Sequence, residues 1–503
     1  MSIKYSYSIL TALAVVALFS GCAVGPNYHR PTLSGNIGYT AQPLTVTSSA
    51  PNIANGQEQR FVSGMDIPQQ WWSLFKSPAL NALIEKSLKA NPTIDAAKAA
   101  LCQARENVSA QMGYYYPSVQ AGYSLSRTRD SGTISPVPNS GKEPYTLHTA
   151  QVNVGFLPDV FGGNRRQVES LQAQADFQRF QLEATYITLT SNVVAAAIQE
   201  ASLRSQISAT LSITKIETEM LGLLRRQFEL GYVAGLDVAA QEAALAQVQQ
   251  TLPPLQKQLA QTRDMIAALA GCFPNEVPEQ KFELASLSLP QDLPVSLPSK
   301  LVEQRPDVRA AEEQMHSASA QIGVAVAAML PNITISADLG STATGISQLF
   351  TPGTRFWSMA GDLMQPIFEG GTLVHRKRAA EAGLDLAEAQ YRSTVIAAFQ
   401  NVADTLYALQ SDADALKAAA AFEQAAKRSL DLARRQFELG YVNYLSLLSA
   451  EQAYQQALIN LVQAQANRFA DTAALFMALG GGWWNGLDIA SSTQQAFSAG
   501  KTN

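Results

Sequence analysis

The chain has 503 residues, of which 47% are hydrophobic and 15% charged, with a formal net charge of −5. This composition excludes an intrinsically disordered chain, and the lack of a basic run argues against nucleic acid as a partner. The length suffices for several domains or for one elongated architecture.

Residues 1–21 are typical of a secretory signal peptide. The apolar stretch at 9–19 is too short to span a bilayer as a helix. It runs into Leu-Phe-Ser-Gly-Cys at 18–22, which resembles the lipobox of bacterial lipoproteins, although Phe19 stands where leucine is usual. We therefore expect cleavage before Cys22 and lipid attachment to its thiol. The alternative is an ordinary secretory signal with an incidental cysteine.

After Cys22 the chain contains no run of 18 or more apolar residues. A membrane-spanning helix is therefore not expected, and any membrane crossing would need strands. Two further cysteines, Cys102 and Cys272, could form a disulfide in an oxidising compartment. The layout derived below places them apart, so we predict that both stay reduced as small, buried apolar side chains.

An internal repeat organises the sequence. Residues 225–233, Arg-Arg-Gln-Phe-Glu-Leu-Gly-Tyr-Val, recur unchanged at 434–442. Nine consecutive identities indicate a tandem duplication, in which each half follows the same plan. Weaker echoes keep the same order along the chain: 91–94 with 305–308, 116–119 with 330–333, and Pro158 and Gly162-Gly163 with Pro366 and Gly370-Gly371.

Each half begins with a helix and a β-hairpin. Pro92 and Pro306 suit the first turn of helices that end near residues 113 and 329. Alternating polar and apolar residues then predict paired strands, and the last strand is the least regular. The hairpins are expected at 117–158 and 331–367. Such strands fit a soluble sheet on a core or a lipid-facing barrel with a wet lumen, and alternation alone does not choose between them.

A long helix follows each hairpin. Apolar residues keep a seven-residue spacing from Val168 to Leu203, which is typical of a coiled coil. The helices expected at 164–229 and 372–438 would each be about 100 Å long. Each ends at a Leu-Gly-Tyr, where glycine can form a left-handed C-cap.

A shorter helix then returns in each half, at 237–270 and 446–478, with Asp237 and Ser446 as N-caps. Pro253-Pro254 predicts a local kink in the first of them. The first helix and the returning helix together nearly match the long one in length. Each half is therefore expected to be a long helix beside two stacked short ones.

Four strands cannot close a barrel, and an open sheet edge is not tolerated in lipid. Single-chain barrels start at about eight strands. If the strands cross a membrane, several copies must share one barrel in a closed cyclic assembly. These arguments do not choose between two copies and three.

Short motifs spread in order along the mature chain are similar to those of the TolC/OprM-type outer-membrane efflux proteins, specifically the NodT-like lipoprotein branch. The resemblance covers nearly all of the mature chain. The motifs lie at 22–28, 71–75 with Pro78, 91–92, 297–298, 305–308 and 478–483.

The resemblance implies a mainly α fold with a β-barrel part. Long coiled-coil helices of a homotrimer form an α-barrel, and four strands per chain contribute to a shared 12-stranded transmembrane β-barrel. It also implies an equatorial collar built from the N-terminal segment, residues 273–298 and the C-terminal tail. The expected division is 1–21 signal, 22–90 N-terminal and equatorial segment, 91–272 first repeat, 273–300 linker, 301–480 second repeat and 481–503 tail.

The implied function is that of the outer-membrane channel of a tripartite efflux or type I export system. It would pass small molecules, such as drugs or toxic compounds, from a periplasmic adaptor and an inner-membrane pump to the exterior. The channel would contact outer-membrane lipid, need no cofactor and perform no chemistry. An enzyme is disfavoured because the four histidines have no metal-ligand spacing and no nucleophile or phosphate-loop motif is present. The stronger rival is a non-conducting trimeric helical stalk or adhesin lipoprotein.

The resemblance also implies two sets of site residues. The adaptor would contact the turns at Leu230-Gly231-Tyr232 and Leu439-Gly440-Tyr441, although the glycines could be C-caps alone. The periplasmic gate would comprise Asp237, Tyr444, Leu445 and Ser449. Ser449 replaces a common aspartate and Gln452 a common arginine, so we expect a gate that depends on Leu445 and Tyr444, with ordinary core packing as the alternative.

Overall fold

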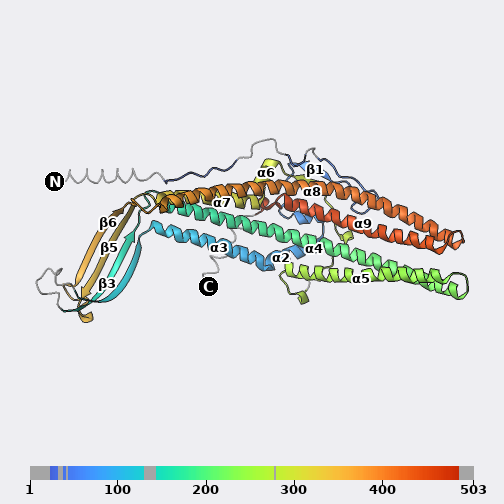
Figure 1. The fold of residues 1–503 in the computed structure, drawn as a ribbon, viewed down its shortest axis with the longest axis horizontal. Helices are drawn as coiled ribbons and strands as arrows, with labels where there is room; N and C mark the ends of the chain where they lie inside the picture. The colour runs from blue at the N-terminus through green and yellow to red at the C-terminus, as the bar shows by residue number, and fades with distance from the viewer. Residues whose placement is uncertain (1–22, 32–37, 41–43, 130–142, 277–278, 487–503) are drawn as a thin grey trace. The chain divides into compact units, whose positions relative to one another are not determined.

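The computed structural model describes residues 23–31, 38–40, 44–129, 143–276 and 279–486 (Figure 1). The signal peptide and Cys22 lie outside the described residues. The chain divides into two compact units. Unit 1 comprises Met1–Pro31, Leu101–Gln178 and Ala311–Tyr391, and unit 2 comprises Thr32–Ala100, Arg179–Ala310 and Arg392–Asn503.

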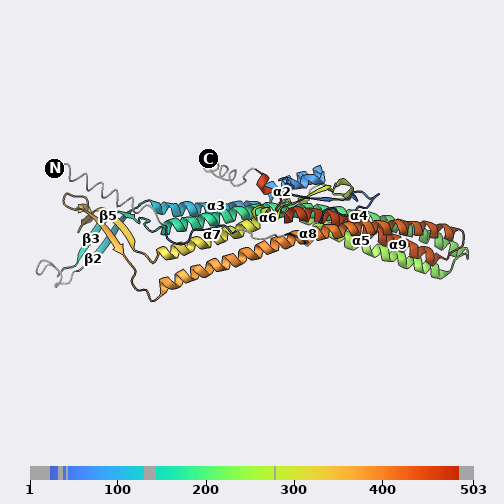
Figure 2. The same cartoon turned by 90° about the horizontal axis from the view of Figure 1, so that it is seen from above.

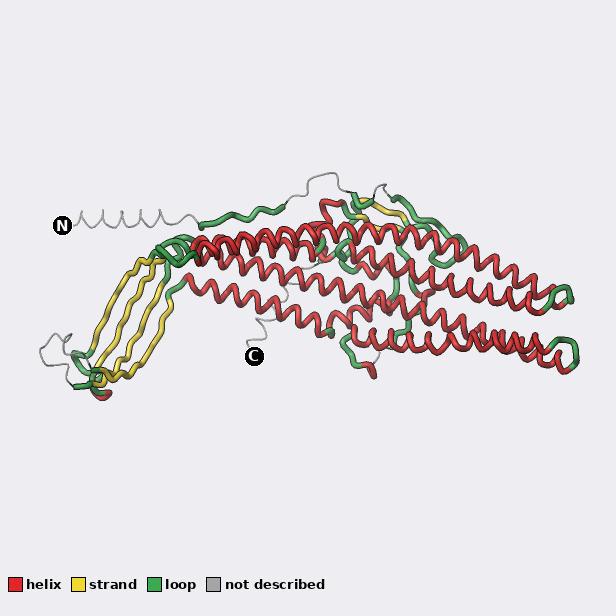
Figure 3. The backbone as a smooth tube through the Cα atoms, viewed as in Figure 1, coloured by secondary structure: helices red, strands yellow, loops and turns green. Residues whose placement is uncertain are grey.

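Unit 1 contains a four-stranded antiparallel sheet (Figure 3, in which strands are yellow). Its strands are β2 (Ser118–Thr128), β3 (Tyr145–Phe156), β5 (Asn332–Ala343) and β6 (Arg355–Met364), in the order β2-β3-β5-β6. All four fall inside the predicted hairpins. The middle pair, β3 and β5, joins the two repeats, so the hairpins form one sheet rather than two.

The register of this sheet separates an apolar face from a polar one. One row of facing residues reads Ala121, Val152, Leu339 and Trp357. The next row reads Gln120, Asn153, Asp338 and Ser358. Within this polar row the Asn153 amide donates to Asp338 at 2.7 Å, and the Ser358 hydroxyl donates to Asp338 at 3.0 Å. The irregular fourth strand therefore alternates in phase with the other three.

Two helices of 67 residues each dominate the chain. They are α4 (Gly163–Glu229) and α8 (Thr372–Glu438), and each contributes residues to both units. Their bounds match the prediction to within one residue, and their length is about 100 Å at 1.5 Å per residue. The seven-residue frame predicted from Val168 is half-buried at Ala175 and buried at every position from Leu182 through Leu203 to Leu224.

Shorter helices complete each repeat: α3 (Pro92–Met112) and α5 (Gly235–Leu269) in the first, α7 (Pro306–Ala327) and α9 (Tyr444–Ala478) in the second. The predicted N-caps are wrong. Asn443 caps α9 by accepting from the Ser446 amide at 3.0 Å, and Asp237 lies at the third position of α5. Helix α5 continues through Pro253 and Pro254, whose surroundings are exposed, so water can solvate the carbonyls that lose their partners.

Unit 2 contains the junctions at which the short helices meet end to end. Gly271 follows α5 with a φ of +69°, and a Cβ there would lie 2.2 Å from the Ala90 carbonyl oxygen. Gly480 follows α9 with a φ of +94°, and a Cβ would lie 2.6 Å from the Gln304 carbonyl oxygen. Only glycine fits either position without strain. The predicted stacking of two short helices in each half is therefore confirmed.

The N-terminal segment and the linker at 273–300 form, within unit 2, a small parallel sheet that the sequence did not predict. Strand β1 (Arg60–Ser63) pairs with β4 (Asp292–Val295). Helices α2 (Pro78–Ala90) and α6 (Pro298–Gln304) accompany it. Short 3₁₀ turns lie at Trp71–Phe75, Gly113–Tyr115, Pro274–Glu276, Leu284–Ser286, Ile346–Gln348 and Trp483–Asn485.

Buried aromatic and charged side chains fix these segments to α9. Trp71 is fully buried and stacks on Phe476, with ring centroids 5.2 Å apart. The buried Arg468 donates to the Gln59 side chain at 3.1 Å and to the Asn55 carbonyl at 3.3 Å. The N-terminal segment therefore packs on α9 through a buried guanidinium, which sequence periodicity does not reveal.

Cys102 and Cys272 are both free, as predicted, although each is half-buried rather than buried. No helix within the described ranges combines the length and apolar character needed to cross a membrane.

Candidate functional site

The two helical turns at the ends of the long helices are C-capped by glycine. Gly231 and Gly440 have φ values of +78° and +76°. The Tyr232 amide donates back to the Gln227 carbonyl at 2.9 Å, and the Tyr441 amide donates to the Gln436 carbonyl at 2.8 Å. This is the Schellman arrangement, so capping explains both glycines.

Capping does not explain the apolar side chains beside those glycines. Leu230, Tyr232, Leu439 and Tyr441 are between 69% and 78% exposed. Exposed aromatic and aliphatic groups that project from a rigid turn are suited to contact another protein. We refer to these four residues as the tips.

Of the four predicted gate residues, only Tyr444 is buried in the core. It packs with Leu224, Ala244 and Leu448, a cluster that joins α4, α5 and α9. Its hydroxyl donates to the Gln241 side chain of α5, which is also buried. Burial and the neighbouring Glu451 raise the pKa of the Tyr444 hydroxyl, so it remains a hydrogen-bond donor.

The remaining gate residues do not join this cluster. Leu445 and Ser449 are exposed on α9. Asp237 is half-buried and accepts a hydrogen bond from the Ala234 amide at 3.2 Å, so its carboxylate caps α5. Leu445 and Ser449 are therefore exposed, whereas Tyr444 is buried and its contacts hold the two repeats together.

A buried polar network surrounds Tyr444 and was missed in the sequence. Gln241 donates to the Glu217 carboxylate at 2.6 Å and to the Glu217 backbone carbonyl at 2.9 Å. Gln455 of α9 donates to the other carboxylate oxygen of Glu217. Glu217 lies on the seven-residue frame that holds Leu203 and Leu224. A carboxylate at a position of this apolar frame is the sequence feature that could have indicated the buried network.

Glu451 of α9 is the least satisfied member of this region. It is 3% exposed, and neither carboxylate oxygen has a hydrogen-bond partner. The nearest cation, Arg434, lies 3.7 Å away, which is too long for a hydrogen bond. Burial and the neighbouring Glu217 raise the pKa of Glu451 to about 7.

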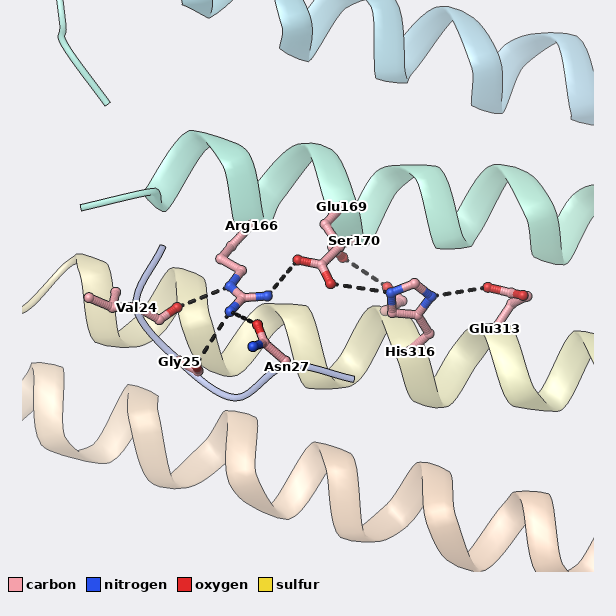
Figure 4. A network of polar contacts seen from close by, with 9 residues as sticks. Val24, Gly25, Asn27, Arg166, Glu169, Ser170, Glu313 and His316 are labelled. Carbon is pink, nitrogen blue, oxygen red and sulfur yellow. Dashed lines mark hydrogen bonds and ion pairs between the residues drawn. The ribbon is translucent and has the colours of Figure 1, made fainter. Parts of the chain in front are cut away.

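A second polar network, in unit 1, holds the strap, which we define as residues 23–28 (Figure 4). The buried Arg166 of α4 donates to the Val24 carbonyl at 3.0 Å and to the Asn27 side chain at 2.8 Å. It also pairs with Glu169 at 2.7 Å. The backbone after Cys22 is therefore attached to a long helix by one guanidinium.

His316 of α7 continues the same network. Its ring stacks on Tyr28, with centroids 4.4 Å apart. Its two nitrogens contact Glu313 at 3.3 Å and Glu169 at 3.2 Å. Hydrogen bonding to Glu313 raises the pKa of His316, burial opposes the shift, and Glu169 raises it further. The strap therefore lies on a histidine whose charged form is favoured by two neighbouring carboxylates.

The two outer strands of the sheet each have one neighbour within the described residues. Strand β2 pairs with β3 and strand β6 pairs with β5. Large apolar side chains on β2 and β6 are exposed, among them Leu125, Trp357 and Leu363. A sheet with unpaired edges and an exposed apolar face fits a lipid-facing wall completed by other strands. In the described part of the chain, no group of three or more His, Cys, Asp or Glu residues could hold a metal ion.

These features define a class of duplicated helical proteins with an amphipathic sheet and exposed helical turns. The profile described as "Outer membrane efflux protein" matches residues 83–272 and 297–481. The chain belongs to this family of outer-membrane efflux channels, whose members are transporters rather than enzymes.

Named relatives match along most of the chain. The pyoverdine export outer membrane protein OpmQ of Pseudomonas aeruginosa is 30% identical over 90% of this chain and 95% of its own length. The probable outer membrane lipoprotein SilC of Salmonella typhimurium is 26% identical over 94% and 98%. The structure of the outer-membrane channel OprN matches with a TM-score of 0.82 and 27% identity, covering 92% of this chain and all of that one.

Proposed function

We propose that three copies of this chain form one efflux channel, with a periplasmic adaptor on the tips and an inner-membrane pump beyond it. The single observation that carries the proposal is the open sheet of four strands with an apolar face. Its outer strands β2 and β6 run in opposite directions, so β6 of one copy can pair antiparallel with β2 of the next. Three copies would then close a barrel of 12 strands.

The tips support the partner assignment. Their exposed leucines and tyrosines recur at equivalent places in both repeats, so each chain offers two similar contact points. A periplasmic adaptor with helical hairpins fits this repeated apolar surface. In the proposed assembly Leu445 and Ser449, which are exposed on α9, narrow the closed end. Tyr444 fixes α9 against α4 and α5, and Asp237 caps the start of α5.

The N-terminus supports a lipid anchor in the outer membrane. We propose that Cys22 carries the lipid and that the strap transfers this attachment to α4 through Arg166. The lipobox-like sequence and the printed lipoprotein name of SilC are consistent with it. The cargo would be small molecules that the pump delivers, such as drugs or other toxic compounds.

A deletion strain tests the cellular function. Loss of this chain should increase accumulation of a fluorescent efflux substrate and sensitivity to toxic compounds, and the wild-type gene should reverse both. A variant with Leu439 and Tyr441 changed to serine should reach the outer membrane as a trimer without restoring efflux. Unchanged accumulation and sensitivity for every compound tested would contradict the proposal.

A further inference from the structure

We propose that one proton, held by Glu451 where it faces Glu217, keeps the two helical hairpins of the chain packed together. Loss of this proton loosens their packing. The inference rests on the proposed function in one respect: the hairpin ends that loosen are the ends at which the proposed channel closes. The contact itself lies entirely within unit 2 and stands on its own geometry.

The first argument is the location of the contact. Helices α4 and α5 form the hairpin of the first repeat, and α8 and α9 form that of the second. Both hairpins extend to the same end of unit 2 (Figures 1 and 2), and side chains from all four helices pack together there. Apolar side chains join them: Met220 of α4 packs with Leu447 and Ala450 of α9 and with Leu430 of α8. A change in charge here acts directly on the contact between the repeats.

The second argument is the difference between equivalent residues. Glu242 in the first repeat corresponds to Glu451 in the second, and Arg225 corresponds to Arg434. Glu242 has a side chain 50% exposed and lies 2.7 Å from Arg225, as an ordinary surface ion pair. Glu451 is buried and lies 3.7 Å from its arginine. The duplication has therefore placed the same carboxylate in two environments, one at the surface beside an arginine and one buried at the contact between the repeats.

The third argument is hydrogen bonding. Glu217 accepts hydrogen bonds from both Gln241 and Gln455. Glu451 accepts from nothing, and an ionised carboxylate buried without donors is strongly disfavoured. The two carboxylates therefore differ in their donors, and the one without donors, Glu451, favours its protonated form.

The charged and titratable groups that act on Glu451 are Glu217 of α4, Arg434 of α8 and Tyr444 of α9. Helix α5 contributes the neutral Gln241, which bonds to both Tyr444 and Glu217. Arg434 is half exposed to solvent, so it compensates a negative charge on Glu451 only weakly. Ionisation of Glu451 would therefore place a negative charge beside the Glu217 carboxylate at a buried contact.

The sign of the pH dependence follows from the raised pKa. Between the ordinary value of 4.5 and the folded value of about 7, the packed state binds a proton that the separated state releases. The stabilisation from Glu451 is therefore complete below pH 4.5 and is lost as the pH rises through about 7. Alkaline conditions should loosen the hairpins.

The test titrates the proton and the packing in the purified full-length protein. Infrared difference spectra from about pH 5 to about pH 9 should show a protonated carboxyl lost near pH 7. Asp412, whose pKa burial and Asp471 also raise to about 7, contributes to the same signal, so Glu451→Gln should reduce it and Glu451→Gln with Asp412→Asn should abolish it. Glu242→Gln, the matched control, should retain the whole signal. A signal that Glu451→Gln leaves unchanged, or a wild type without it, would overturn the assignment.

Amide hydrogen exchange over residues 217–224 and 444–451 tests the coupling. After correction for intrinsic rates, wild-type protection relative to Glu451→Gln should fall by up to about tenfold per pH unit between pH 4.5 and about 7, and should level off at higher pH. If Glu451→Gln does not fold, Glu217→Gln serves instead. It should move the midpoint of the pH-dependent loss of protection to lower pH. Equal pH profiles in the wild type and in the folded variant would overturn the proposal.

Conductance in planar bilayers separates this proposal from the channel function. Channels that conduct equally at all pH values, with pH-independent exchange, would refute the proton-dependent contact and leave the channel intact. A protein that never conducts but shows the expected exchange profile would refute the channel and leave the contact intact.

Discussion

Asn91 and Arg305 perform the same task in the two repeats, although they are different residues. The Asn91 amide donates to the carbonyl of Leu269, the last residue of α5, at 2.9 Å. The Arg305 guanidinium donates to the carbonyl of Ala478, the last residue of α9, at 3.0 Å. Each bond satisfies a helix-end carbonyl that has no partner within its own helix. The two junctions thus keep the short helices collinear.

The junctions predict a difference between two glycine substitutions. Gly271→Ala should lower stability by more than about 1 kcal/mol, because a Cβ would clash with the Ala90 backbone and φ is positive. Gly222→Ala, within α4 and with open space around it, should raise stability by about 0.4–1 kcal/mol. Thermal unfolding of the purified variants checks both. Equal effects would show that the junction is not tightly packed.

The strap should be released when Arg166 is removed. Arg166→Ala takes away the donors to Val24 and Asn27, so protease cleavage after Cys22 should become faster. Arg165→Ala is the matched control, because Arg165 pairs with Asp159 instead. Faster cleavage in both variants, or in neither, would contradict the role given to Arg166.

His316 makes strap attachment dependent on pH. Its folded-state pKa is raised above 6.5, so its contribution is complete below that value and is lost as the pH rises through the raised pKa. Strap cleavage should therefore accelerate in alkali. His316→Phe keeps a ring against Tyr28 but carries no charge, and its cleavage should lose this pH dependence. A variant with the wild-type profile would show that another group is responsible.

The two faces of the sheet should respond differently to a charge. Leu339→Arg places a cation on the apolar face and should cost about 2–4 kcal/mol if that residue lies near the bilayer midplane. Thr334→Arg, on the polar face opposite Asp362, should be tolerated. The yield of folded protein in outer-membrane fractions measures both. Equal yields would argue against a lipid-facing sheet.

The sequence predicted the parts of the fold that repeat. Periodicity located α8 at its observed bounds, and the recurrent Leu-Gly-Tyr located both tips. It did not predict the pairing of β1 with β4, because four-residue strands far apart in the chain carry no periodic signal. Nor could it show that Glu451 is buried, because Glu242 occupies the equivalent position in the first repeat and is exposed. The difference arises only where the two repeats pack together.

The central claim is that this chain forms a conducting channel, and single-channel recording of the purified protein in planar bilayers tests it most directly. The account predicts discrete conductance steps, with longer or larger openings after Leu445→Ala, because Leu445 is exposed on α9 where the proposed assembly narrows. Trimers that insert but never conduct, either as the wild type or as Leu445→Ala, would contradict the account and favour a non-conducting stalk.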